Sequence, residues 1–416
     1  MASCELQPAT DLSEPSSRST IAEQIEPEKL YDRNFVLAFL SQTVFVIANT
    51  LMAHYGRWIE FLGGNLQQVG WITGVCVATS IVMRPMMALL INRLGAKTTW
   101  WMGYLVFSLS ASVNCFLPDL NFAIYFIRSC NVLGAAIVFA SSLTYISQIA
   151  PEERRTEAIG ILGVGGFFGM LVGPYLGDLL LGDGTRERSG FLTLFAMAAA
   201  ANIFPGIMLY FLKAPKRPPS VHSLRMSQFV HVAREYWPGR ILLVDFVFGV
   251  CMTVPFAFLV NFVDDLNLRF AGWSEVGFFF ICYASVGIIF RVGLRRLPEQ
   301  IGPQNVLLIG LCVMAVGMFS FSLVGPQRVS FLAIPAVLAG LGHSLMFHTM
   351  TSLTIHSFPQ EYRGTGSALA LMTLDLGTLL GAPVLGWIGA EFGYSMLFNT
   401  IAFALIATFV FCLKKI

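Results

Sequence analysis

Charged side chains are scarce in this chain, and their scarcity argues against an ordinary soluble domain. Of the 416 residues, 12% are Asp, Glu, Lys or Arg, whereas 56% are hydrophobic. Soluble domains carry about 25% charged residues. The chain instead contains many separated apolar stretches of about 20 residues, a length that lets a helix span a bilayer. The composition therefore indicates an all-α membrane protein.

Motifs for soluble catalysis and for metal binding are also missing. The chain has no GxxxxGK[ST] phosphate loop, no GxSxG elbow and no HExxH sequence, which disfavours ATP hydrolysis and the corresponding hydrolases. Its eight cysteines are scattered and form no CxxC or Cys/His cluster, so we interpret them as small packing residues. The formal net charge of +2 gives no indication of nucleic-acid binding. We expect no enzyme activity, no cofactor, no metal and no nucleic-acid partner.

The apolar stretches predict twelve membrane-spanning helices. Residues 1–33 precede them and are polar and rich in Ser, Glu and Pro, which predicts a disordered tail without the pattern of a signal peptide. The basic, Pro-containing residues 213–240 are predicted to link two six-helix bundles, residues 34–212 and 241–413. The expected spans are 34–54, 68–90, 98–117, 121–149, 156–181, 190–212, 241–263, 274–291, 305–324, 330–356, 362–388 and 394–413.

Lysine and arginine are distributed unequally between the two sides of such a membrane protein. Seventeen of them fall on the side that holds both termini and the central linker, and five fall on the other side. Positively charged loops stay on the cytoplasmic side of a membrane. The sequence therefore predicts a multi-pass protein of the inner or plasma membrane with both termini in the cytoplasm.

The two halves of the chain repeat each other at an offset of 207 or 208 positions. The matching pairs are Gly70 and Gly277, Arg84 and Arg291, Gly95 and Gly302, Pro151 and Pro359, Gly169 and Gly377, and Gly173 and Gly381. Parallel repeats of about six helices are typical of secondary transporters, which alternate the access to a site near the membrane midplane. The expected architecture is therefore two parallel six-helix repeats.

Residues 160–181 combine a membrane-spanning length with seven glycines and one proline, Pro174. Gly169, Gly173 and Gly177 recur at every fourth position, so they lie on one helix face and permit close approach of a neighbouring helix. We predict a contact surface here, with a counterpart at Gly377 and Gly381. The spacing leaves open whether this surface is static or slides.

Three motifs resemble the major facilitator superfamily over about residues 34–413. Residues 88–97, ALLINRLGAK, resemble the G-x-x-x-D-R-x-G-R-R loop of that family. Arg128 and Asn131 resemble the buried arginine motif of its proton-coupled members. The glycine stretch resembles the antiporter motif of its drug and sugar efflux branches. The resemblance implies a transporter that works by alternating access and is driven by protons.

Two positions depart from those motifs. Asn92 stands where the loop usually has Asp, which weakens the charge-relay role that the resemblance implies, and Asp178 stands where the antiporter motif has its second closing Gly. In the loop, Gly95 would permit a sharp turn. Arg93 and Lys97 are either part of a gate or ordinary anchors at the cytoplasmic surface.

Ionisable side chains inside the expected spans are costly and are therefore candidates for function. Asp375 lies near the centre of its span and aligns with Phe167 in the other half. A carboxyl at that depth could take up a proton in one state and release it in another, so Asp375 is the leading candidate for the proton carrier. The alternative is a satisfied hydrogen-bond acceptor. Arg128 must find a carboxylate, a carbonyl or a ligand, and we expect it to contact the substrate or to form a structural ion pair.

The weaker candidates are polar residues scattered over several spans. His343 and His348 could relay protons, but five residues apart on one helix they point in different directions, and each could be a satisfied buried histidine. Substrate-cavity candidates are Gln42 and Asn49, on one face of the first span, and Asp245, which could instead cap its helix. We expect Asp178 to be solvated.

The sequence thus predicts a secondary transporter that exports a small organic solute in exchange for protons and acts as a monomer. The expected first span lacks the acidic residue that many similar drug/proton antiporters place there. Proton-coupled or facilitated uptake of a small polar or anionic metabolite therefore stays open. So does a membrane receptor that binds a solute without carrying it.

Overall fold

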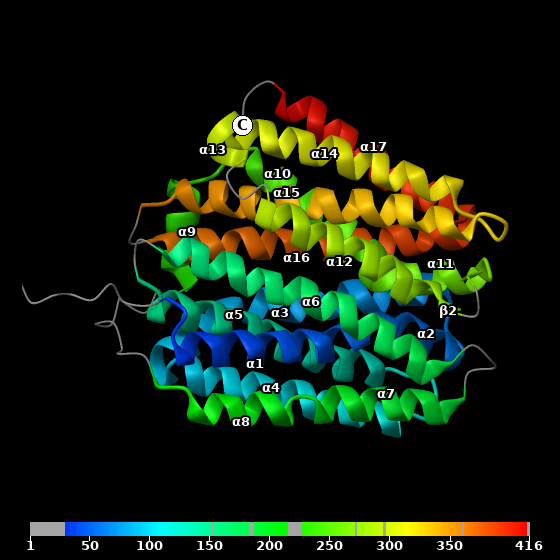
Figure 1. Ribbon diagram of the computed structural model, residues 1–416, viewed down its shortest axis with the longest axis horizontal. Coiled ribbons are helices and arrows are strands. Elements are labelled where there is room, and N and C mark those ends of the chain that lie inside the picture. The colour runs from blue at the N-terminus through cyan, green and yellow to red at the C-terminus, as the bar shows by residue number, and fades with distance from the viewer. Residues whose placement is uncertain are drawn as a thin grey trace, which may run out of the picture.

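The computed structural model describes residues 30–151, 154–182, 187–214, 226–270, 273–293, 297–359 and 362–413. They form a bundle of long helices whose axes are roughly aligned (Figure 1). A small antiparallel hairpin of β1 (Arg269–Phe270) and β2 (Trp273–Ser274) is the strand structure among these residues. The predicted all-α membrane fold is confirmed.

The described residues of the first half form eight α-helices and two short 3₁₀ turns. These are α1 (Arg33–Thr50), a 3₁₀ turn (Leu51–His54), α2 (Tyr55–Phe61), α3 (Leu66–Leu94), α4 (Ala96–Val113), a 3₁₀ turn (Asn114–Phe116), α5 (Ala123–Ile149), α6 (Arg155–Leu181), α7 (Arg188–Ala200) and α8 (Ile203–Phe211).

The second half begins with a helix in the linker. Its elements are α9 (Met226–Glu235), α10 (Ile241–Thr253), a π-turn (Val254–Phe258), α11 (Leu259–Asp265), α12 (Glu275–Gly293), α13 (Leu297–Ile301), α14 (Pro303–Ser320), 3₁₀ turns (Phe321–Leu323 and Val329–Leu332), α15 (Ala333–His356), α16 (Arg363–Phe392) and α17 (Tyr394–Cys412). The sequence predicts no helix in the linker. The structure places α9 there, packed against α16.

Among the described residues, eleven helical segments are long and apolar enough to cross a membrane. The remaining predicted span, residues 98–117, corresponds to α4, which is not apolar enough to meet that criterion. Its first turns carry Lys97 followed by two threonines and two tryptophans, which lower its apolar character. Nevertheless, α4 packs along α5 and α7 as a member of the bundle.

The first span is longer than predicted. It was expected to end at residue 54, but it continues through the 3₁₀ turn and α2 as far as Phe61. The extension adds Arg57 and the acidic residue Glu60 to a span that had been read as lacking any acidic group. Most other predicted boundaries lie within a few residues of the observed helix ends.

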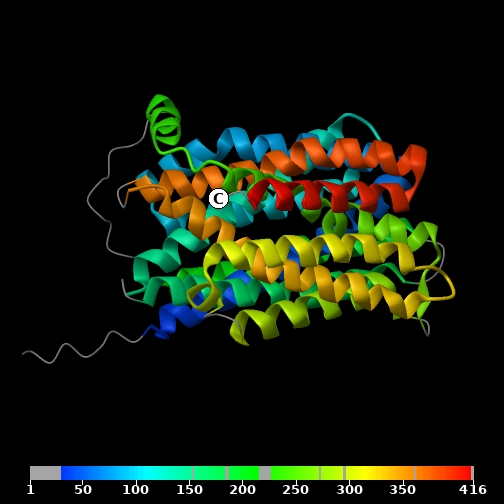
Figure 2. The same ribbon diagram turned by 90° about the horizontal axis from the view of Figure 1, so that it is seen from above.

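We call the side of the bundle where α1 begins the near side, and the side where α2 ends the far side. In Figure 1, α9 and α13 lie at the near end, and α2, α11 and β2 lie at the far end. Figure 2 shows α9, in green, at the same near end when the bundle is seen from above.

The glycine face of α6 packs against α1. A Cβ atom on Gly169 would lie 2.5 Å from the side chain of Val46, and one on Gly173 would lie 2.0 Å from Oγ1 of Thr50. The Thr50 hydroxyl donates to the carbonyl of Gly169 at 3.0 Å. The predicted contact surface is therefore confirmed as a packing surface, while its sliding stays a prediction.

The second half contains the same arrangement between α10 and α16. A Cβ atom on Gly377 would lie 2.0 Å from the carbonyl oxygen of Phe246, and one on Gly381 would lie 3.0 Å from Val250. Because these helices are the repeat counterparts of α1 and α6, the sequence offset corresponds to equivalent helix packing. Gly95 and Gly302, another repeated pair, have φ angles of 87° and 85° and end the turns that precede α4 and α14.

The two halves of the chain meet along two helix pairs, α3 with α16 and α6 with α12. Backbone approach is close in the first pair, since a Cβ atom on Gly70 would lie 2.4 Å from the carbonyl oxygen of Ala382 and 3.1 Å from Gly386. In the second pair, the repeat counterpart Gly277 lies against Tyr175. These two interfaces position the charged residues described below.

We predict that Gly173→Ala and Gly377→Ala each lower the thermal melting temperature of the purified protein. Each added methyl group would lie closer to neighbouring atoms than van der Waals contact allows. Overpacking of this kind costs about 1–3 kcal/mol. Gly166→Ala is the matched control in α6, because nothing lies within 4 Å of its Cβ position. A melting temperature of either contact variant at or above that of Gly166→Ala would contradict the packing role.

Candidate functional site

The far ends of the two halves are joined by a buried cluster of charged groups around Arg57 of α2. Its Nε and Nη2 atoms donate to the two carboxylate oxygens of Asp264 on α11 at 2.8 and 2.9 Å. Its Nη1 atom donates to Asp178 on α6 at 2.6 Å. Arg57 is only 4% exposed and Asp178 only 5%. One guanidinium thus holds carboxylates from both halves of the chain.

His54 completes this far-side cluster. Since arginine has only donors, the 2.8 Å contact between Nη1 of Arg57 and Nδ1 of His54 makes Nδ1 an acceptor. The proton of the neutral ring is therefore on Nε2, which donates to the carbonyl of Pro174 at 2.9 Å. A Cβ atom on Gly177 would lie 2.2 Å from the His54 ring, so this glycine of the antiporter-like motif makes room for the histidine.

The far-side cluster follows the internal repeat. Arg57 and Asp264 are separated by the same 207 positions that relate the two halves. Asp178 also accepts from the backbone N–H of Gly277 at 2.7 Å, across the interface of α6 with α12. The expectation that Asp178 is solvated was wrong, because α2 extends the first span and covers it. Arg57 is one of the five basic residues assigned above to the non-cytoplasmic side, and it is likewise buried.

Asp375 of α16 forms a second charged contact between the halves. Its Oδ2 atom accepts from Nε of Arg84 on α3 at 3.0 Å and forms an ion pair with Nη2 of the same residue. The hydroxyl of Ser80 donates to the same oxygen at 2.8 Å. Arg84 lies ten residues before the end of α3, or about 15 Å from it, so the pair lies inside the membrane region.

Arg128 of α5 does not pair with a carboxylate among the described residues. Its Nη1 atom donates to Oδ1 of Asn131 at 3.1 Å, and its guanidinium lies 4.3 Å from the centre of the Tyr55 ring. This bond fixes the orientation of the Asn131 amide, whose Nδ2 is buried and has no hydrogen-bond partner. The structural ion pair that had been considered for Arg128 is thus not formed, and donors remain available there.

The two histidines of α15 have different partners, as their spacing predicted. His343 is buried, and its Nδ1 atom shares a hydrogen bond with the Tyr283 hydroxyl. His348 is half-buried, and its Nδ1 atom accepts from Nη2 of Arg291 at 2.6 Å.

The remaining cavity candidates are less open than predicted. Asp245 is fully buried, accepts from the Thr354 hydroxyl at 2.9 Å and leaves its Oδ1 atom without a partner, so it does not cap the start of α10. Gln42 is buried with an unpartnered Oε1 atom, whereas Asn49 is half-buried.

The connection between α3 and α4 is hydrogen-bonded to the end of α8. Lys97 donates to the carbonyls of Tyr210 and Leu212 at 3.1 and 2.6 Å, which ties the start of α4 to the end of α8. The side chain of Arg93 is exposed. The side chain of Asn92 lies outside the described residues.

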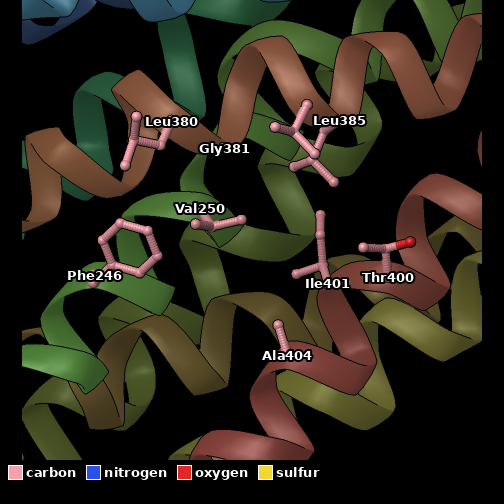
Figure 3. A pocket seen from close by; sticks show the side chains of 9 residues that line it. Phe246, Val250, Leu380, Gly381, Leu385, Thr400, Ile401 and Ala404 are labelled. Carbon is pink, nitrogen blue, oxygen red and sulfur yellow. The ribbon is translucent and has the colours of Figure 1, made fainter.

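A groove lies between α10, α16 and α17, lined by Phe246, Val250, Leu380, Gly381, Val384, Leu385, Thr400, Ile401 and Ala404 (Figure 3). Its one polar side chain, Thr400, donates to the carbonyl of Met396 in its own helix. The groove therefore offers no free polar group to orient a solute, and we do not assign it as the transport site.

The far-side cluster was missed because Arg57 and Asp264 fall just beyond the ends of the predicted spans and were read as loop residues. Two signals pointed to it. Asp178 replaced a motif glycine, and Arg57 and Asp264 stand at the repeat offset with opposite charges. Opposite charges at equivalent positions indicate a contact across a pseudo-two-fold axis.

The apolar helices and the charged contacts between two repeated halves define a multi-pass membrane protein. A family model described as Major Facilitator Superfamily matches residues 34–374 and 296–415. The chain belongs to that superfamily and is a transporter, not an enzyme, with a small-molecule substrate and the lipid bilayer as its surroundings.

Relatives and solved structures of similar proteins are transporters as well. The chain is 22% identical to the multi-drug resistance efflux pump PmrA of Streptococcus pneumoniae, covering 82% of this chain and 85% of the relative. It is 21% identical to the staphylopine export protein of Staphylococcus aureus, covering 88% and 91%. The structure of the nucleoside transporter NupG superposes with a TM-score of 0.73 at 12% identity, covering 92% and 100%. A POT family transporter gives 0.73 at 14%, covering 92% and 96%.

We predict that Arg57→Gln destabilises the protein by about 3–5 kcal/mol, because it leaves the buried Asp178 and the half-buried Asp264 without their cation. A lowered melting temperature would measure the loss. The triple variant with Asp178→Asn and Asp264→Asn should recover most of it, since no unpaired charge remains.

Arg328→Gln is the control for this prediction. Arg328 is an exposed arginine whose described side-chain contact is the ring of Phe331. Its replacement should change the stability by about 0.5 kcal/mol or less. If the triple variant melts as low as Arg57→Gln, burial of charge is not the cause of the loss.

Proposed function

We propose that this transporter exports a small organic solute in exchange for protons, with Asp375 as the proton carrier. The near side would be the cytoplasmic side, as the distribution of lysine and arginine predicts. The protein would act as a monomer in the inner or plasma membrane. Its similarity to an efflux pump and an export protein supports the outward direction.

The observation that carries the proposal is the contact of Asp375 with Arg84 and Ser80. It is an ion pair between the two halves, formed by a carboxylate at membrane depth. Separating such a pair leaves an uncompensated buried charge, which costs several kcal/mol. Protonation of Asp375 removes one of the two charges and so lowers the cost of moving α16 away from α3.

Two charged contacts then control the two sides of the membrane. Opening the far side requires Arg57 to leave Asp264, and opening the near side requires α3 and α16 to separate around Arg84. The far-side cluster contains a neutral histidine and a doubly paired arginine, so it does not depend on Asp375. A proton that binds Asp375 acts on one contact only and thereby biases which side opens.

We predict that Asp375→Asn abolishes proton-driven transport but retains exchange of solute without a gradient. The amide cannot carry a proton, although it can still accept from Ser80 and Arg84. The measurement uses proteoliposomes with trapped pyranine, which reports proton movement when members of a panel of organic anions and lipophilic cations are added. Asp119→Asn, an exposed far-side residue, is the control and should stay within about twofold of the wild type.

Three results decide the proposal. If Asp375→Asn keeps the proton-driven flux and its pH dependence, Asp375 is not the carrier. If the wild type moves solutes down their own gradient but never with protons, it is a facilitator. If solutes bind but none of the panel moves under any gradient, the protein is a receptor that does not transport them.

A further inference from the structure

The interface of α6 with α12 is the repeat counterpart of the interface that holds Arg84 and Asp375. Arg291 on α12 corresponds to Arg84, and Phe167 on α6 corresponds to Asp375. Arg291 lies about 24 Å along α12 from Glu275, which is close to the depth of Arg84 in α3. One interface thus pairs a guanidinium with a carboxylate, and the other presents an equivalent guanidinium to a phenyl ring.

Arg291 has no carboxylate partner among the described residues. Its guanidinium lies 5.5 Å from the centre of the Phe167 ring, and a Cβ atom on Gly163 would lie 2.7 Å from its Nη2 atom. The one hydrogen bond described for its side chain goes to Nδ1 of His348. A buried or half-buried guanidinium without an anion is costly at membrane depth.

The donors of Arg291 and His348 outnumber the acceptors described around them. The guanidinium has five N–H groups and no acceptor. Because Nδ1 of His348 accepts from Arg291, the proton of its neutral ring is on Nε2, which has no described partner. Both side chains are half-buried, so the cluster is not sealed off. A group with only acceptor oxygens, such as a carboxylate, would satisfy these donors.

Aromatic rings surround this donor cluster. The ring centres of Phe347 and His348 lie 5.2 Å apart, and the guanidinium of Arg291 lies 5.5 Å from the centre of the Phe167 ring. An apolar or aromatic body attached to the anionic group would therefore contact rings and not other charges. The surroundings fit an organic anion better than a small inorganic one.

We propose that Arg291 and His348 bind the carboxylate of an aromatic or apolar organic anion during transport. The solute carboxylate takes the role toward Arg291 that Asp375 has toward Arg84, accepting two N–H groups of the guanidinium. Once it is bound, both interfaces between the halves contain a guanidinium–carboxylate pair. The inference rests on the proposed export function, to which it adds the substrate class.

The test measures binding to the purified full chain in detergent, without any gradient. The probes are benzoate, phenylacetate and 1-naphthoate, each compared with its uncharged amide by calorimetric titration. At least one carboxylate should bind about tenfold or more tightly than its amide, since charge-assisted bidentate bonds are lost with the amide. Arg291→Gln should weaken carboxylate binding by about tenfold or more and leave amide binding unchanged.

A pair of variants at Phe167 gives the sharpest comparison. Phe167→Asp places a carboxylate where the repeat has Asp375, so it should pair with Arg291 and block carboxylate binding. Phe167→Asn removes the same ring without adding a charge and should retain the preference for carboxylates. Arg291→Lys keeps the charge without the bidentate geometry, so it should bind more weakly than the wild type and more tightly than Arg291→Gln.

The outcomes separate this inference from the proposed function. Asp119→Asn, the exposed far-side control, should keep carboxylate binding. The inference is overturned if none of the carboxylates binds better than its amide, or if Arg291→Gln binds them as the wild type does. It is also overturned if Phe167→Asp and Phe167→Asn bind them equally well. Proton-driven transport that persists alongside any of these results would leave the export function intact.

Discussion

A guanidinium inside a membrane needs an anion or a set of acceptors, and this requirement determines how the two halves of the protein meet. Arg57 holds carboxylates of both halves at the far side, and Arg84 holds Asp375 across the interface of α3 with α16. In the described part of the chain, the partners of Arg128 and Arg291 are an amide, aromatic rings and a histidine. The two fully paired arginines therefore join the halves, whereas the other two are left with unused donors.

The glycines make those charged contacts possible. They allow α6 to approach α1 and α16 to approach α10 at backbone distance, so each pair is closely packed. Gly177 also makes room for the His54 ring, which places the histidine beside Arg57. Repeat-related helices thus share the same packing, and the differences between the halves are concentrated in a few polar positions. The differences include Asp375 against Phe167, Asp178 against Gly386 and Arg57 against Asp264.

Sequence patterns predicted a large part of this arrangement. The 207–208 offset predicted equivalent helix pairs, the glycine spacing predicted a contact face, and Asp375 was singled out by its depth alone. The partner of Asp375 could not be predicted, because Arg84 lies 291 positions away and nothing local links the two. The far-side cluster was missed for a related reason. The first span continues past a 3₁₀ turn, which interrupts the helical periodicity. A prediction from periodicity therefore ends the span before Arg57.

The sequence by itself determined the membrane class, the internal repeat, the location of the close-packing glycines and the depth of the ionisable residues. These properties follow from local composition and periodicity, which do not depend on contacts between distant parts of the chain. The tertiary structure alone decided which charges are neutralised. Pairing depends on distances between side chains from different helices, and a shift of a few ångströms turns a buried ion pair into an unpaired charge. Arg84 and Arg291 are equivalent in the repeat, but Phe167 stands where the other half has Asp375, and among the described residues only Arg84 has a carboxylate partner.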